Sequence, residues 1–168
     1  MKEISDQQLA EIAEQIGDTL QALRLMLITA ESCTGGWVGQ VVTSISGSSH
    51  WYDRGFITYS NASKREMLGV STDILSRFGA VSEQTARAMA EGAVNSGVGR
   101  VSLAITGIAG PGGGSEDKPV GLVWFAWAGN GRQSRTESCQ FDGDRQTVRR
   151  QAVAHALHGV LRFLRNNP

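Results

Sequence analysis

An apolar run that stops at a polar turn and two glycines constrains the fold of this chain more than any other stretch. Residues 25–28 are continuously apolar, and residues 31–36 have the sequence Glu-Ser-Cys-Thr-Gly-Gly before a helix-like segment that begins at Trp37. Unbroken apolarity is typical of a strand buried on both faces, so the stretch predicts a strand, a tight turn and a helix. The free N–H groups at the start of such a helix point at whatever binds there.

Helix and strand patterns alternate along the whole chain. Apolar residues at three- and four-residue spacing, together with capping residues, predict helices over 5–23, 34–44, 62–68, 71–79, 83–95 and 145–164. Strands are predicted over 25–30, 54–59, 100–106, 120–128 and 132–141, with a hairpin at Asn130-Gly131. This order predicts an α/β fold with three α/β/α layers, whose mixed, mostly parallel sheet contains one antiparallel hairpin. We expect a single domain over residues 1–168.

Composition excludes several classes of partner. The chain has 16 basic and 16 acidic residues, and this balance argues against binding of nucleic acid. No apolar run approaches the roughly 20 residues that span a bilayer, and the N-terminus lacks the apolar core of a secretory signal. Cys33 and Cys139 are too few for a disulfide framework or a zinc site. We therefore expect a cytoplasmic protein with reduced thiols and without a membrane partner.

Two candidate nucleophiles, Ser32 and Cys33, are adjacent in the predicted turn. A serine hydroxyl attacks only when a base takes its proton, whereas a thiol beside a helix start can become a thiolate. Only one of these two side chains is expected to face a substrate from a regular turn. Buried cysteines are often only small apolar side chains.

Lys64 is a candidate base, because a cation is disfavoured in the first turn of a helix and partial burial lowers a lysine pKa further. Tyr59 closes a predicted strand at the same edge of the sheet, so Ser32, Tyr59 and Lys64 converge if the two strands are parallel. The alternative is a solvated lysine and a packed tyrosine. His155 and His158 lie one turn apart without a third ligand, so ordinary helix histidines and no metal are expected.

Two glycine-rich turns follow predicted strands, at residues 34–36 and 107–114. Successive N–H groups in such turns can bind a phosphate or an oxyanion, although a plain connector is equally compatible. Neither turn matches a P-loop or a dinucleotide fingerprint. Arg145, at the start of the last helix, would add a phosphate clamp or would be a solvated charge.

Several motifs in one order resemble the CinA C-terminal domain family, the nicotinamide-nucleotide amidohydrolases or NMN deamidases. The motifs are residues 29–36, 55–61 with Lys64, 79–82, 104–113, and Gly121 with Val123. The resemblance covers nearly the whole chain. Many members carry a further large N-terminal domain, whose activity cannot be attributed to this chain.

The resemblance implies a compact α/β/α fold, a homo-oligomer (dimer or higher) and hydrolysis of the carboxamide of nicotinamide mononucleotide without metal or cofactor. It assigns catalysis to Ser32, Tyr59 and Lys64. The hypothesis is that Ser32 attacks the amide carbon, that Tyr59 and Lys64 carry its proton, and that N–H groups of residues 33–36 stabilise the oxyanion. The alternative is a non-catalytic nucleotide-binding or regulatory module. The expected substrate-binding residues are Cys33, Thr34, Gly35, Gly36, Thr106, Gly107, Gly110, Gly112 and Arg145.

Overall fold

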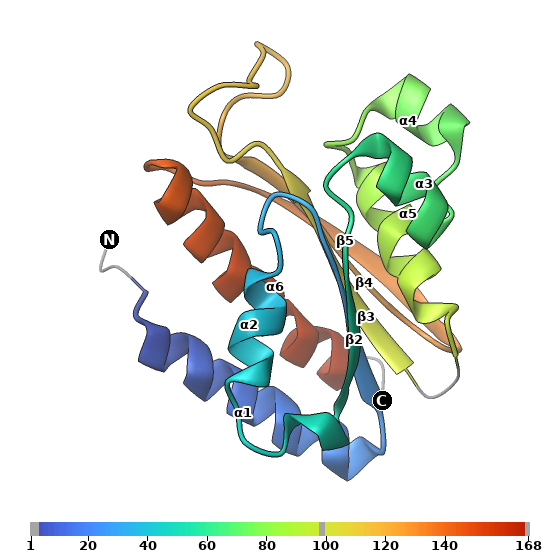
Figure 1. Ribbon diagram of the computed structural model, residues 1–168, viewed down its shortest axis with the longest axis vertical. Helices are drawn as coiled ribbons and strands as arrows, with labels where there is room; N and C mark the ends of the chain where they lie inside the picture. Colours follow the sequence, from blue (N-terminus) through green and yellow to red (C-terminus); the bar gives the residue numbers. More distant parts are fainter. Residues whose placement is uncertain (1–3, 98–99, 167–168) are drawn as a thin grey trace.

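A computed structural model describes residues 4–97 and 100–166, and its centre is one mixed sheet (Figure 1). Within these residues, five strands are ordered β2–β1–β3–β4–β5. β1 pairs in parallel with β2 and β3, whereas β4 pairs antiparallel with β3 and β5, so parallel and antiparallel pairings are equal in number. The predicted hairpin joins β4 and β5. The bounds are β1 (Met26–Glu31), β2 (Tyr52–Ile57), β3 (Arg100–Gly107), β4 (Leu122–Gly129) and β5 (Arg132–Gln140).

Helices cover both faces of the sheet, which confirms the three-layer prediction. One face carries α1 (Asp6–Leu23), α2 (Trp37–Thr43) and α6 (Arg145–Asn166), and the other carries α3 (Asn61–Leu68), α4 (Thr72–Phe78) and α5 (Glu83–Val94) (Figure 1). A short 3-10 helix, η1 (Ser48–His50), precedes β2 and was not predicted. No helix among residues 4–97 and 100–166 is long and apolar enough to cross a bilayer.

The buried strand β1 explains the apolar run of the sequence. Leu27 belongs to the apolar cluster beneath α1, α2 and α6, whereas the next residue, Ile28, belongs to the cluster beneath α5. Successive side chains of a strand point to opposite faces, and both faces of β1 are covered. Continuous apolarity is therefore what this position requires.

Serine caps set where the helices of the second layer begin. The Ser60 side chain accepts a hydrogen bond from the Ser63 N–H at the start of α3, and Ser82 accepts one from the Thr85 N–H at the start of α5. Such caps satisfy N–H groups that lack a partner within the helix. The cap at Ser60 sets the phase of α3 and turns Lys64 towards the sheet.

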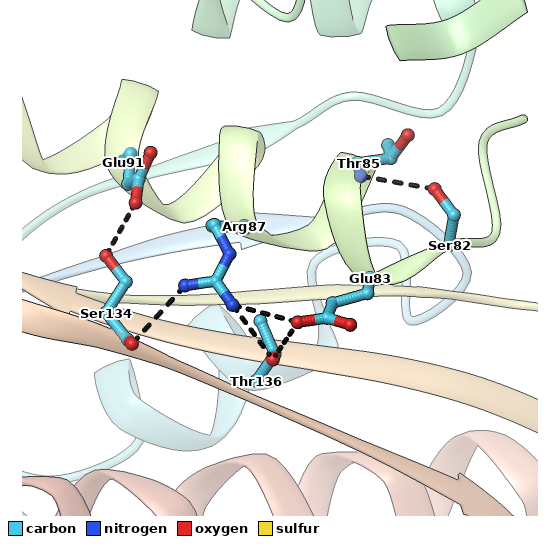
Figure 2. A network of polar contacts seen from close by, with 7 residues as sticks. All are labelled: Ser82, Glu83, Thr85, Arg87, Glu91, Ser134 and Thr136. Atoms are coloured by element: carbon cyan, nitrogen blue, oxygen red, sulfur yellow. Dashed lines mark hydrogen bonds and ion pairs between the residues drawn. The ribbon is translucent and has the colours of Figure 1, made fainter. Parts of the chain in front are cut away.

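Polar contacts fasten α5 to the edge strand β5 (Figure 2). The Glu83 carboxylate accepts hydrogen bonds from Arg87 Nη2 and Thr136 Oγ1, both at 2.8 Å, and Ser134 Oγ donates to Glu91 at 2.7 Å. The Glu83–Arg87 pair is partly exposed, so it contributes little to stability by itself. These contacts satisfy the polar face of β5 and fix how α5 lies across the sheet.

Candidate active site

A pocket of about 260 Å³ opens where the parallel strands β1 and β3 end. Ser32 directly follows β1 and is tied to the sheet, because its N–H donates to the carbonyl of Ile105 on β3 at 3.0 Å. Carboxyl ends of parallel strands form the usual ligand crevice of an open α/β sheet. Nine predicted site residues line this pocket, namely Ser32, Cys33, Tyr59, Lys64, Thr106, Gly107, Gly110, Gly112 and Arg145.

A buried lysine lies against the serine hydroxyl. Lys64 Nζ is 2.9 Å from Ser32 Oγ and donates to the carbonyl of Thr58 at 2.7 Å, and the Lys64 residue is only 1% exposed. Burial lowers the pKa of Lys64, and the nearby Cys33 opposes this shift. The structure therefore excludes the solvated lysine considered from the sequence. The largest cause of the lowered Lys64 pKa is burial of the amine away from water. From the sequence, the helix dipole was expected to be the main cause.

Tyr59 lies on the exposed rim of the pocket, whereas Lys64 is buried. Strand β2 ends at Ile57, two residues before the predicted end, and Tyr59 is 63% exposed. Its phenol oxygen accepts a hydrogen bond from Arg145 Nη2 at 3.0 Å, while Arg145 Nη1 donates to the Gly110 carbonyl at 2.8 Å. Within the described chain, no hydrogen bond joins Tyr59 to Ser32 or Lys64. Arg145 thus connects Tyr59 to the glycine-rich loop that follows β3.

Cys33 borders the same pocket as Ser32, and it also belongs to the apolar cluster beneath α1, α2 and α6. The two residues open a tight turn in which the Gly35 N–H donates to the Ser32 carbonyl at 3.0 Å. Burial raises the pKa of the Cys33 thiol to about 11. Cys33 therefore stays a neutral thiol near neutral pH, which favours Ser32 as the nucleophile.

Three predicted substrate-binding residues do not line the pocket. Thr34 is fully buried, and Gly35 and Gly36 face a separate groove that also contains Trp37 and Arg149. The two glycines have positive φ angles of 61° and 97°, so they allow the backbone to turn into α2.

Thr106 borders the pocket, but its hydroxyl is already engaged. It donates to the Ala80 carbonyl at 2.7 Å. This bond ties β3 to the segment that precedes α5. The hydroxyl of Thr106 therefore shapes the pocket wall.

Glu31 organises the turn, a role that the sequence reasoning missed. The residue is 1% exposed, and its carboxylate accepts hydrogen bonds from Thr34 Oγ1 (2.7 Å), the Val38 N–H (2.9 Å) and the Gly39 N–H (3.1 Å). The N–H groups at the start of α2 are thus occupied by the protein's own carboxylate. An acidic residue just before a predicted helix start is the signal that could have found it.

Arg149 of α6 is the second residue that the sequence reasoning missed. Its Nε donates to the Cys33 carbonyl at 3.0 Å, and its Nη2 donates to the Thr34 carbonyl at 2.9 Å. Among the described residues, the N–H groups of Cys33 and Thr34 donate to no acceptor on another residue. Of these two residues only Cys33 borders the pocket, so its N–H is the one that can reach a ligand there.

The paired histidines of α6 lie away from this pocket. His155 Nε2 is 3.0 Å from a Glu137 carboxylate oxygen, and its ring packs against Phe125 at 4.6 Å between centroids. Burial lowers the pKa of His155, and the Glu137 hydrogen bond opposes this. In the part of the chain that the structure describes, no group of three or more His, Cys, Asp or Glu side chains could hold a metal.

Comparison with known proteins places the chain in a family. The family profile described as "CinA C-terminal domain" matches residues 9–164. The chain belongs to the CinA C-terminal domain family. It is 49% identical to the nicotinamide-nucleotide amidohydrolase PncC of Escherichia coli (strain K12) over 164 residues, which cover 97% of this chain and 99% of that protein.

Two further comparisons extend this assignment to the CinA C-terminal domain family. The PncC protein of Pseudomonas putida is 45% identical over 152 residues, covering 90% of this chain and 94% of that one. The crystal structure of competence/damage inducible protein CihA from Agrobacterium tumefaciens superposes with a TM-score of 0.90 at 43% identity, covering 97% and 98% of the two chains. The fold and the length are therefore shared with members of this family.

Proposed function

We propose that this protein is a nicotinamide-nucleotide amidohydrolase, which converts nicotinamide mononucleotide and water to nicotinate mononucleotide and ammonia. Its similarity to two proteins named as such, at 49% and 45% identity over nearly the whole length of each, supports the reaction. The observation that carries the mechanism is the 2.9 Å contact between Ser32 Oγ and the buried amine of Lys64. A buried amine with a lowered pKa is suited to remove the serine proton.

In the first step, Lys64 Nζ takes the proton of Ser32 while Oγ forms a bond to the carboxamide carbon. The carbonyl of Thr58 accepts a hydrogen bond from the same amine and holds it in place. The N–H group of Cys33, a residue that borders the pocket, donates to the oxygen on which negative charge develops. Removal of one such donor typically costs about 10²- to 10³-fold in kcat.

In the second step, Lys64 returns the proton to the amide nitrogen, the carbon–nitrogen bond breaks, and ammonia leaves. The nicotinoyl group is then an ester on Ser32. Water attacks this ester with Lys64 as the base, the carbon–Oγ bond breaks, and Ser32 regains its proton. Lys64 thereby serves as the primary base in both halves of the reaction.

The rim of the pocket is suited to the ribose phosphate of the substrate. Arg145 presents a guanidinium beside Tyr59 and the loop that contains Gly107, Gly110 and Gly112. Guanidinium groups and glycine N–H groups are common phosphate ligands. We assign Tyr59 a substrate contact at this rim, since its hydroxyl accepts a hydrogen bond from Arg145.

The experiment is a coupled ammonia assay on the purified protein, with nicotinamide mononucleotide and with free nicotinamide, with and without a chelator. The variants are Ser32→Ala and Lys64→Met, and the control is Ser49→Ala, at an exposed position of helix η1. Loss of general-base assistance predicts about a 10²- to 10⁴-fold lower kcat for Lys64→Met. Near-normal ammonia release by Ser32→Ala would end the serine mechanism. Binding of the nucleotide by the wild-type protein without ammonia release would favour the non-catalytic module.

A further inference from the structure

The glycine-rich loop of residues 108–121 projects beyond the end of the sheet (Figure 1). Two backbone hydrogen bonds close its base, at 2.7 and 2.9 Å, and join Ile108 to Gly121 and to Leu122. Beyond this base, residues 111–117 are exposed. Three glycines of the loop line the active-site pocket, namely Gly110, Gly112 and Gly113. Glycine-rich backbone has many accessible conformations, so contacts beyond the base determine where this side of the pocket lies.

Two cations of the described chain hold the loop beyond its base, one from each layer of helices. Arg145, at the start of α6, donates from Nη1 to the Gly110 carbonyl at 2.8 Å. Lys118, which belongs to the loop, donates from Nζ to the carbonyl of Phe78 at the end of α4, at 2.6 Å. Because α6 and α4 cover opposite faces of the sheet, the loop is fastened to both layers (Figure 1).

The contact of Lys118 with α4 is suited to the end of a helix. Carbonyl groups in the last turn lack partners within the helix, and a cation is favoured at that end. The lysine stem starts from a fixed point, because the Ser115 N–H donates to the Lys118 carbonyl at 2.8 Å and the Lys118 N–H donates to Ser115 Oγ at 3.1 Å. The ammonium group therefore joins an ordered turn of the loop to an ordered helix end.

The segment that receives Lys118 continues into another wall of the pocket. Ala80 and Val81 line the pocket, and Val81 also borders the neighbouring groove, in which Lys118 lies. This wall is held by the sheet, because the Ala80 carbonyl accepts a hydrogen bond from Thr106 Oγ1 of β3 at 2.7 Å. Lys118 thus fastens the glycine-rich side of the pocket to a wall whose position is set independently.

We propose that Lys118 is a positioning residue for the nucleotide, which straps the glycine-rich loop to the end of α4 so that the loop glycines meet the ribose phosphate. This inference rests on the proposed amidohydrolase function, in which the loop and Arg145 receive the phosphate. Lys118 acts through the loop. Without the strap, a smaller fraction of the protein holds the loop in the binding position, and the apparent affinity for substrate falls by that fraction. Ground state and transition state lose this binding together, so KM rises while kcat changes little.

The test compares Lys118→Met and Lys118→Arg with a matched control, Arg77→Met. Arg77 is also a cation in the last turn of α4, but its described contacts are the Asp73 carboxylate, 3.3 Å from Nη1, and the Phe78 ring, 5.3 Å from the guanidinium carbon. The control therefore removes the same charge from the same helix end and leaves the loop untouched.

Two readouts are measured for each variant, together with the melting temperature. The first is kcat and KM for ammonia release from nicotinamide mononucleotide. The second is the rate at which a glutamyl endopeptidase cleaves the native protein after Glu116, which is exposed in the loop. Cleavage of a native protein reports how often the cleaved segment opens, so this readout does not depend on the activity.

We expect KM of Lys118→Met to rise by about 5- to 20-fold while kcat stays within about threefold, because the strap acts on substrate binding and not on the chemistry of Ser32. Cleavage after Glu116 should accelerate at least about threefold. Lys118→Arg, whose guanidinium can also donate to the Phe78 carbonyl, is expected to stay close to the wild type in both readouts. Arg77→Met is expected to stay within about twofold of the wild type.

Three results would overturn the inference. One is an equal rise of KM in Lys118→Met and Arg77→Met. Another is a loss confined to kcat, which a protein with a smaller folded fraction would show. The third is unchanged cleavage after Glu116 in Lys118→Met. A wild-type protein that releases no ammonia would instead remove the proposed function, whereas the cleavage rates would still decide whether Lys118 fastens the loop.

Discussion

Replacement of Glu31 by glutamine is the sharpest test of how the nucleophile turn is built. The wild-type carboxylate accepts three hydrogen bonds, from Thr34 Oγ1, the Val38 N–H and the Gly39 N–H. Glutamine has one acceptor oxygen and an NH₂ group that only donates. If the oxygen keeps the bonds to Thr34 and Val38, the NH₂ group faces the Gly39 N–H, and two donors oppose each other in a buried site.

The structure sets the magnitude of this change. Loss of one hydrogen bond to a charged group costs about 1.5–3 kcal/mol, and a buried donor without an acceptor costs about as much. Loss of the negative charge at the start of α2 costs roughly a further 0.3–1 kcal/mol. Because these terms overlap, we expect Glu31→Gln to lower the free energy of unfolding by about 3 kcal/mol.

The assay is urea unfolding followed by tryptophan fluorescence and by circular dichroism, with the midpoint and the m-value compared between variants. The control is Glu11→Gln on the exposed face of α1, where the carboxylate accepts one bond from Gln7 Nε2. This control is expected to stay within about 0.5 kcal/mol of the wild type. A Glu31→Gln protein less than about 1 kcal/mol below the wild type, with an unchanged m-value, would refute the reasoning.

Three further predictions concern the lysine, the thiol and the packing of α5. Because burial lowers the pKa of Lys64, kcat/KM should rise with pH as the amine loses its proton, with a midpoint below the ordinary lysine value; a midpoint at or above that value contradicts the assignment. Because the pKa of Cys33 is raised to about 11, iodoacetamide should label its thiol slowly near neutral pH, as measured by peptide mapping. Rapid labelling that the substrate prevents would instead indicate that Cys33 is the nucleophile. Gly92→Ala should lower the free energy of unfolding by at least about 1–3 kcal/mol in the same urea assay, because its new Cβ would clash with the Leu68 carbonyl. The control is Gly112→Ala, whose new Cβ would meet no atom within 4 Å apart from its chain neighbours. Equal stabilities of the two variants would contradict this packing.

Local rules made most of the architecture predictable from the sequence. The apolar run of 25–28 predicted a strand covered on both faces, and serines such as Ser60 and Ser82 marked helix starts that the structure confirms. These signals depend on side chains a few residues apart, which contact one another in any chain that forms the element. The same short-range logic located Ser32 at a strand end and Lys64 near a helix start.

Contacts between distant segments decided the rest. Whether Lys64 met Ser32 or water depended on the pairing of β1 with β2. Tyr59 lies beyond the end of β2, is largely exposed and accepts a hydrogen bond from Arg145, 86 residues away in the chain. Arg149 reaches the Cys33 carbonyl from 116 residues away. Such a bond forms only after the sheet and both helix layers have come together, so no local pattern announces it. The sequence alone therefore determined which elements form and which side chains stand at their ends, whereas the packing of those elements determined which side chains touch.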